Sequence, residues 1–300
     1  MLRTTFQSLT GNAQRRLSLS YNALEQANNR LSTLKQISRG SEDPASFGRA
    51  ALLRGESASI DSYSRVGDDA QARLAATGTK LDQAMNVYQR INELGITAAT
   101  GTANDASRGA ARVELISLRD ELASTANSKY LGQPLFAGFK DTNAVTTAAP
   151  WTFTGTGDAI TRKVSDSDTV RVNVTAGEIF SFNDASGTPT NVFKVIDDMA
   201  AAMAPGGDPT QIMAGVSLMA TARATLSTAE SSVGAATNRV TSVVQRNGDF
   251  QLSLTTSLSK VEDVDLADAI TDQSRLNAGY QAALGATAKA IQPSLVDWLR

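Results

Sequence analysis

The 300-residue chain contains neither cysteine nor histidine. Without cysteine there are no disulfides, thiolate metal sites or cysteine nucleophiles, and without histidine the commonest general base and metal ligand is missing. An enzyme built from this chain would depend on carboxylates, lysines and hydroxyls, so we expect no catalytic site, no metal and no cofactor. The 28 Lys and Arg residues balance 30 Asp and Glu residues, which predicts no basic surface for nucleic acid.

Long apolar runs are also missing. No stretch approaches the roughly 18 apolar residues that span a bilayer, and the mean hydropathy is −0.18, so we expect no membrane insertion. Residues 1–24 include Arg3, Arg15 and Arg16 but lack the apolar segment of a signal peptide. The chain is therefore expected to be cytosolic or exported without a cleaved signal.

The composition changes twice along the chain. Residues 1 to about 130 are rich in Ala, Leu, Ser, Gln and Arg, and the same helix-forming bias returns from about 208 to 292. Between them, residues 134–192 are rich in Thr, Val, Phe, Gly and Pro, with alternating segments at 159–164, 169–174 and 179–182 that predict strands. The pattern indicates a mainly α fold with an inserted β-rich domain.

Both helical arms show apolar residues at coiled-coil spacing. Asp43 and Pro44 resemble an N-cap and a first helical position, which predicts one long helix from Pro44 to about Ala99, and a second runs from about 208 to 258. Each end of the chain carries a narrow seam of residues three and four apart. The seam residues are Phe6, Leu9, Leu17, Leu24, Leu31 and Leu34 at one end, and Leu266, Ile270, Tyr280, Leu284, Ile291, Leu295 and Trp298 at the other.

These seams predict an elongated long-helix coiled-coil hairpin in which the N- and C-terminal helices pair. We expect three domains: a terminal coiled-coil assembly domain (1–40 with 262–300), a long-helix rod (41–140 with 208–261) and an outward-facing β-rich insert (141–207). Such a seam commonly serves packing within one molecule, but here it buries few large side chains for the length of chain that must be ordered. We therefore predict that the terminal helices are mobile in the free monomer and order against other subunits.

Two other patterns have ordinary structural explanations. Gly155 and Gly157 lack the third glycine and the following helix of a dinucleotide-binding loop, which favours a simple loop. The acidic residues of 262–268 fit the start of a helix, where the helix dipole favours negative charge. An enzymatic or sugar-binding role for the insert would require carboxylates to converge on a pocket; the candidates are Asp158, Asp166, Asp168 and Glu178.

Residues 31–45, which end in Asp43, Pro44 and Ala45, resemble the N-terminal region of the flagellin superfamily. Two further segments are similar to the hook–filament junction branch of that superfamily, the third hook-associated proteins. One is Pro134 to Phe139, with Leu135, Phe136, Gly138 and Phe139 as its characteristic residues at the exit from the helical domain. The other is the C-terminal stretch, residues 293–300.

The resemblance implies a structural subunit of the bacterial flagellum, not an enzyme, that is exported by the flagellar type III apparatus and lies outside the cell. It implies a ring of copies with their termini at the inner core, and neighbours that are the first hook-associated protein and flagellin. It also implies a flagellar export chaperone on the C-terminal helix. The alternatives are a flagellin of the filament, a sugar-binding or enzymatic module on the insert, and a coiled-coil adhesin or phage fibre.

Overall fold

The computed structural model describes residues 2–100, 103–184 and 186–291, and the chain divides into two compact units. Unit 1 comprises Met1–Ser59 with Phe250–Arg300, and unit 2 comprises Ile60–Asp249. The helices α2 (Pro44–Ala99) and α6 (Pro209–Glu262) contribute residues to both units. The fold is mainly α with a small β region, which confirms the expected fold class.

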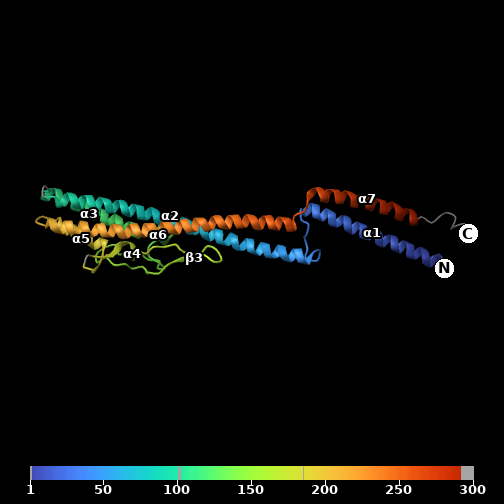
Figure 1. Cartoon of the computed structure of the whole chain (residues 1–300), viewed down its shortest axis with the longest axis horizontal. Helices are drawn as coiled ribbons and strands as arrows, with labels where there is room; N and C mark the ends of the chain where they lie inside the picture. Colours follow the sequence, from blue (N-terminus) through green and yellow to red (C-terminus); the bar gives the residue numbers. More distant parts are fainter. Residues whose placement is uncertain (1, 101–102, 185, 292–300) are drawn as a thin grey trace. The chain divides into compact units, whose positions relative to one another are not determined.

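In unit 1, α1 (Leu2–Thr33) and α7 (Leu266–Ile291) pack side by side, which confirms the predicted pairing of the two terminal helices (Figure 1). The predicted cap of α2 is also present, because the Asp43 carboxylate accepts hydrogen bonds from the backbone N–H groups of Ala45 and Ser46, both at 3.1 Å. Asp265 caps α7 in the same way, with the Ala267 N–H at 2.9 Å. Both helices thus begin where a carboxylate satisfies free backbone donors.

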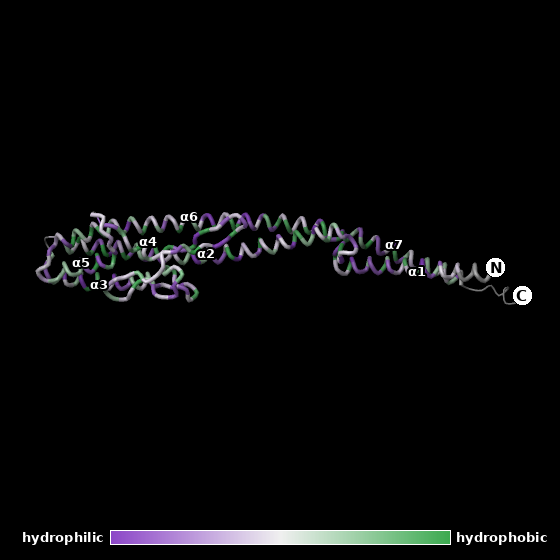
Figure 2. Tube along the Cα trace, turned by 90° about the horizontal axis from the view of Figure 1, so that it is seen from below, coloured by the Kyte–Doolittle hydropathy of each residue, from purple (hydrophilic) through white to green (hydrophobic). Residues whose placement is uncertain are grey.

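In unit 2, α2 and α6 approach closely at two glycines. A Cβ atom added at Gly67 would lie 2.5 Å from Val244 Cγ2, and one added at Gly95 would lie 2.5 Å from Val216 Cγ2. Apolar and polar residues alternate along both helices at short intervals (Figure 2). The helices α3 (Asp105–Ala126) and α5 (Val192–Ala202) pack on each other and complete the helical part of this unit.

One contiguous hydrophobic core fills unit 2. Its largest fully buried side chains include Tyr88, Phe136, Phe180 and Phe193. The indole of Trp151 stacks on Phe193 with ring centroids 5.0 Å apart, and its Nε1–H donates to Asp197 at 2.6 Å. Trp151 therefore packs on α5 within the insert, and its polar end is satisfied there.

Among the described residues, the named strands form three antiparallel hairpins. They are β1 (Lys129–Tyr130) with β2 (Gln133–Pro134), β3 (Thr161–Lys163) with β4 (Thr169–Arg171), and β5 (Ser181–Asn183) with β6 (Pro189–Asn191). The segments 159–164 and 169–174 do pair, over the shorter lengths of β3 and β4. No described helix is long and apolar enough to cross a membrane.

The strand predicted at 179–182 is wrong in its first half. The short helix α4 (Ala176–Phe180) occupies that position, and β5 starts only at Ser181. The Glu178 carboxylate accepts a hydrogen bond from the Thr175 N–H at 2.9 Å, which satisfies a donor at the helix start. Ile179 and Phe180 are both buried from this helix, so a local cap and tertiary packing outweigh β propensity.

Candidate assembly surface

The contact between α1 and α7 combines half-buried leucines, among them Leu17, Leu24, Leu31 and Leu276, with small and polar side chains. Ala27 and Ala269 are buried in it, each 8% exposed. Tyr21 and Tyr280 have ring centroids 5.8 Å apart, and the Gln273 amide donates to Asn28 Oδ1 at 3.3 Å. This composition lets the two helices lie close together, but it removes little apolar surface from water.

The seam predicted on α7 does not coincide with the side that meets α1. Leu266, Ile270 and Leu284 are 51%, 50% and 41% exposed. The residues that α1 does cover include Ala269 and Ala283, which directly precede Ile270 and Leu284 in the sequence. Tyr280 belongs both to the predicted seam and to the covered side. Periodicity correctly groups the apolar residues on one side of the helix, but it does not tell which partner covers that side.

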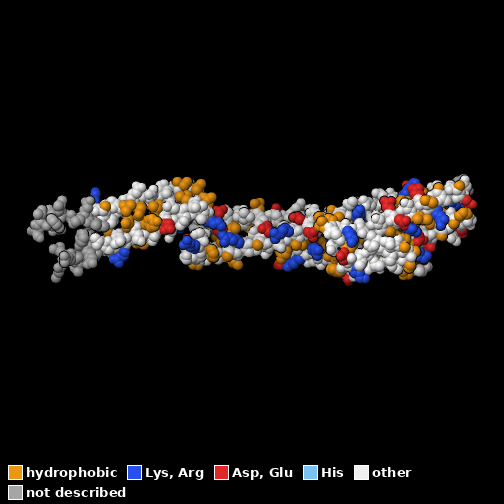
Figure 3. Space-filling model, turned by 180° about the vertical axis from the view of Figure 1, so that it is seen from behind, with side chains coloured by type: hydrophobic (Ala, Val, Ile, Leu, Met, Phe, Trp, Pro, Cys, Tyr) orange, Lys and Arg blue, Asp and Glu red, His pale blue; other side chains and the backbone are white. Residues whose placement is uncertain are grey.

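Leu266, Ile270 and Leu284 form what we call the outer face of α7. At 100° per residue they lie within about 40° of one another around the helix axis. On α1, Leu19 is 69% exposed, and Leu34 just beyond the helix is 55% exposed. Figure 3 shows hydrophobic side chains gathered over these two helices. Unit 1 thus presents apolar surface that nothing within its described residues covers.

The other predicted seam residues divide into two groups. Leu17, Leu24, Leu31 and Tyr280 are half-buried in the α1–α7 pair. The side chains of Phe6, Leu9 and Ile291, and the whole of Leu295 and Trp298, lie outside the described part of the structure. Their place in an assembly interface therefore stays a prediction.

A buried carboxylate at the end of α6 links the segment after α1 to α2. The Glu262 side chain is 5% exposed and forms ion pairs with Lys35, at 3.1 Å, and with Arg54. The neighbouring backbone adds hydrogen bonds, among them the Val264 N–H to the Leu34 carbonyl at 3.1 Å. The sequence predicts Glu262 in an acidic helix start, which is wrong: Glu262 is the last residue of α6, and its role as the buried partner of two cations was missed. Lys35 and Arg54 lie more than two hundred residues away in sequence, and no local pattern reveals them.

The segment resembling the junction branch is a tightly packed turn. Leu135, Phe136 and Ala137 are buried, and Gly138 has a φ of +67°. The Thr156 N–H donates to the Ala137 carbonyl at 3.0 Å, and the Phe139 N–H donates to the Thr156 hydroxyl at 3.0 Å. Any side chain at Gly138 would collide with Thr156, so glycine is required here both by φ and by space.

Gly155 also packs against this turn. A Cβ atom there would lie 2.8 Å from the Ala137 carbonyl oxygen, so this glycine serves a close backbone approach. Phe139, the last residue of the resembling segment, is 66% exposed.

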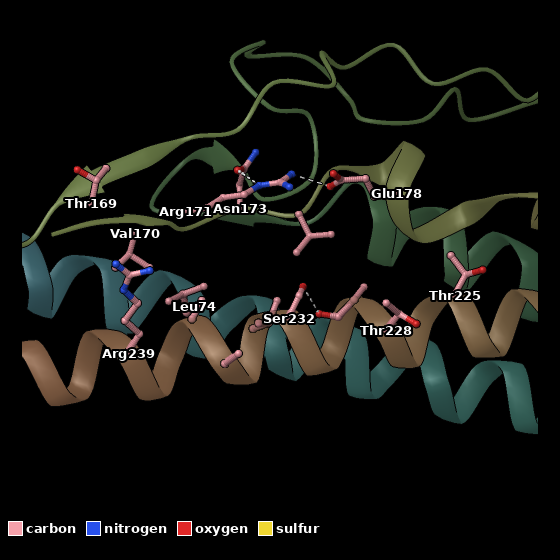
Figure 4. Close-up of a pocket in the computed structure, with 15 residues that line it drawn as sticks. Leu74, Thr169, Val170, Arg171, Asn173, Glu178, Thr225, Thr228, Ser232 and Arg239 are labelled. Carbon is pink, nitrogen blue, oxygen red and sulfur yellow. Dashed lines mark hydrogen bonds and ion pairs between the residues drawn. The ribbon is translucent and has the colours of Figure 1, made fainter.

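The insert and α6 enclose an open groove of about 760 Å³ (Figure 4). Glu178 lines it and points toward Arg171, with which it forms an ion pair at 2.7 Å. Burial opposes ionisation of Glu178, but the hydrogen bonds from Arg171 and the Thr175 backbone hold its pKa below the usual value. Its charge is thus already neutralised by a neighbour.

The other three candidate carboxylates do not line the groove. Asp168 forms ion pairs with Arg239, at 3.0 Å, and Arg246, at 2.9 Å, and the hydrogen bond from Arg239 is the main reason that the pKa of Asp168 is lowered. Asp166 pairs with Lys163 at 3.0 Å. The convergence that an enzymatic or sugar-binding insert would require is therefore not found among the described residues, and no group of three acidic side chains suited to a metal occurs there either.

Two family models match the chain. Residues 6–141 match the bacterial flagellin N-terminal helical region, and residues 216–299 match the bacterial flagellin C-terminal helical region. The chain belongs to the flagellin superfamily. The residues 142–215, which neither model matches, contain most of the insert, including β4 and α4 beside the groove.

Relatives within the superfamily include both hook-associated proteins and flagellins. The chain is 25% identical over 274 residues to flagellar hook-associated protein 3 of Escherichia coli (strain K12), covering 84% of this chain and 86% of that protein. It is 24% identical over 291 residues to the flagellin of Bacillus subtilis (strain 168), covering 94% and 93%. The solved structure of flagellar hook associated protein-3 from Legionella pneumophila has the same fold, with a TM-score of 0.63 at 15% identity over 70% of this chain and 98% of that one.

Proposed function

We propose that this chain is a structural subunit of the bacterial flagellum that joins the hook to the filament. In this proposal the terminal helices complete their folding only when they pack against those of neighbouring copies. The observation that carries the proposal is the exposed outer face of α7, where Leu266, Ile270 and Leu284 share one side of a helix that is already paired on another side.

The physical reason is the small apolar surface that unit 1 buries by itself. Fully burying one leucine or isoleucine is worth about 1.5–3 kcal/mol, and these three side chains remain half-exposed in the isolated chain. Packing them against a neighbouring copy supplies the missing free energy at the moment of assembly, as in segments that fold on binding.

A junction position is favoured over a filament position by the segment from Pro134 to Phe139. Its sequence is similar to the pattern of the junction branch, and within it Leu135, Phe136 and Ala137 are buried while Gly138 adopts a positive φ. The neighbours proposed for the ring of copies are the first hook-associated protein on the hook side and flagellin on the filament side. An export chaperone would cover the C-terminal helix before export, the assembled protein would lie outside the cell, and no enzymatic activity is required of it.

A deletion strain tests this function. We expect hooks without filaments on the cells and unpolymerised flagellin in the medium, as seen by electron microscopy and immunoblotting. Normal filaments on the deletion strain would contradict the proposal. Immunogold labelling along whole filaments of the wild type would instead support the filament alternative.

Complementation then tests the outer face. The Ile270→Ser and Leu284→Ser double variant should fail to restore filaments, whereas Val113→Ser should restore them. Val113 is a matched control because it is 71% exposed and lies on α3 in unit 2.

A further inference from the structure

Residues 163–168, which we call the hairpin tip, close the β3–β4 hairpin and contact α6 through charged groups. The Asp168 carboxylate forms ion pairs with Arg239 at 3.0 Å and with Arg246 at 2.9 Å. These two arginines lie about two turns apart on α6, so one carboxylate spans that length of the helix. The tip is therefore fixed along α6 and not at a single point.

The tip also has a buried contact with α6 and a contact with α2. Val164 is fully buried, and its carbonyl accepts a hydrogen bond from the Asn247 amide at 2.9 Å. Asn247 is also buried, so losing this bond would leave two buried polar groups unpaired. On the α2 side, the Lys163 ammonium lies 5.6 Å from the centroid of the Tyr63 ring, within the range of a cation–π interaction. One short turn thus contacts both long helices of unit 2.

Hydrogen bonds within the tip hold its own shape. The Asp168 N–H donates to the Ser165 hydroxyl at 2.9 Å, and the Val164 N–H donates to the Asp168 carbonyl at 3.0 Å. Lys163 and Asp166 form an ion pair at 3.0 Å across the same turn. A turn that is already ordered loses little conformational entropy when it contacts the helices, so its contacts can be effective although several are exposed.

The contacts of the tip lie close to where unit 2 ends on both helices. Unit 2 comprises 60–249, and Tyr63 and Asn247 are within three residues of its two ends. Beyond them the α2–α6 pair includes a polar contact, in which the Gln251 amide donates to the Ser57 hydroxyl at 2.7 Å. Elements open first where they bury the least apolar surface, so opening of this helix pair is expected to start on the unit 1 side.

We propose that the hairpin tip is a strap that ties α2 to α6 at the end of unit 2 and stops opening of unit 1 from spreading into unit 2. This inference rests on the proposed function, under which unit 1 completes its folding only on assembly. A turn that contacts both helices must be released before either helix can open past it. The insert would thus keep the body of the subunit folded while its ends are still mobile.

Limited digestion of the whole-chain monomer with trypsin tests the strap, because slow cleavage of a folded chain follows the population of the opened form. Asp168→Asn removes the charge that pairs with α6 and nearly keeps the size of the side chain. We expect cleavage after Arg65, an exposed residue of α2, to become at least about threefold faster, while Arg90, deeper in unit 2, stays the more slowly cleaved site. Asp168 pairs with α6, so faster cleavage of α2 requires that the tip hold both helices.

The opposite substitution gives the reciprocal measurement. Tyr63→Leu removes the cation–π contact on α2 and keeps an apolar side chain, and it should accelerate cleavage after Arg246 on α6 by about twofold. Asp166→Asn is the matched control in the same turn, because Asp166 is 95% exposed and its ion pair is with Lys163 inside the tip. This control should leave both cleavage rates unchanged.

Two results would overturn the strap. One is unchanged cleavage after Arg65 in the Asp168→Asn variant, and the other is equally fast cleavage after Arg65 and Arg90, which would indicate general unfolding. Either result leaves the proposed function intact, since it concerns unit 2 alone. Resistance of the wild-type monomer to cleavage after Arg16 and Arg275, which are exposed on α1 and α7, would instead contradict folding on assembly.

Discussion

The two units of this chain bury very different amounts of apolar surface. Among the described residues of unit 1, the buried apolar side chains are Ala27, Ala50, Leu254 and Ala269, three of which are alanines. Unit 2 has one contiguous core with several aromatic side chains, among them Phe136, Phe180 and Phe193. The same chain therefore contains one part that can be stable by itself and one part whose apolar residues still face water.

Under the proposed function, this difference lets one subunit be exported and then assemble with its neighbours. Unit 2 would supply the folded body, and the exposed apolar residues of unit 1 would make the contacts with other molecules. If unit 1 buried its apolar residues within a single chain, it would keep no exposed apolar surface to drive assembly. The comparison can be tested by substitutions that affect one unit and spare the other.

The largest effect is expected from Phe193→Ala. Phe193 is fully buried and contacts Trp151 and Phe180, so its loss should lower the free energy of unfolding of the monomer by about 3–5 kcal/mol. Leu284→Ala, at a 41% exposed position of unit 1, should change it by less than about 0.5 kcal/mol. Urea titrations of both variants measure the difference, and equal losses would contradict the division into a stable and an unfinished unit.

The Ile270→Ser and Leu284→Ser double variant should separate folding from assembly. We expect an unchanged unfolding midpoint for the monomer but at least about tenfold less protein incorporated into isolated flagella, because two apolar side chains lose their burial in the interface. Quantitative immunoblots of purified flagella measure incorporation. A large loss of monomer stability would show that these residues already serve the isolated chain.

Tyr88→Phe should make the monomer more stable. Its hydroxyl is buried without a partner, and removing an unsatisfied buried group should raise the free energy of unfolding by about 1 kcal/mol. Tyr130→Phe, at a half-buried tyrosine, is the control. A destabilised Tyr88→Phe monomer would show that the hydroxyl has an internal partner after all.

The smallest effect concerns acid stability of unit 2. Arg239 and Arg246 hold the pKa of Asp168 below its ordinary value near 4. The two ion pairs of Asp168 therefore stabilise the fold above about pH 4, and this stabilisation is lost as the pH falls through the lowered pKa. Asp168→Asn should therefore lower the melting temperature slightly at pH 7 and not at all well below pH 3. Asp166→Asn, whose side chain is 95% exposed, should be neutral at both.

Local signals were sufficient to predict the long helices. Asp43 and Pro44 fix the start of α2, and the helix indeed runs from Pro44 to Ala99. The β1–β2 hairpin was missed because its turn uses Leu131 and Gly132, both at positive φ, where Asn-Gly is the common pair. The prediction of a strand at 179–182 was wrong in its first half, where the cap at Glu178 and the burial of Phe180 favour a helix. An alternating sequence pattern does not reveal either of these contacts.

The candidate surfaces were only partly predictable for a related reason. Spacing identified Leu266, Ile270 and Leu284 as one side of a helix, but which side meets α1 depends on Ala269 and its fit to Ala27. Tyr88 stands in the helical spacing of α2 like any core residue. Its unpaired hydroxyl becomes visible only when α6 brings Arg223 and Met219 beside it.

Hydrogen exchange measured on the free monomer and on isolated flagella tests the central claim most directly. In the monomer, we predict that amides of α1 and α7 exchange within seconds while those of α2 and α6 in unit 2 remain protected for hours, and that assembly protects α1 and α7 as well. Equal protection of α1, α7 and the unit 2 helices in the dilute monomer would contradict the account, because unit 1 would then be complete without its neighbours.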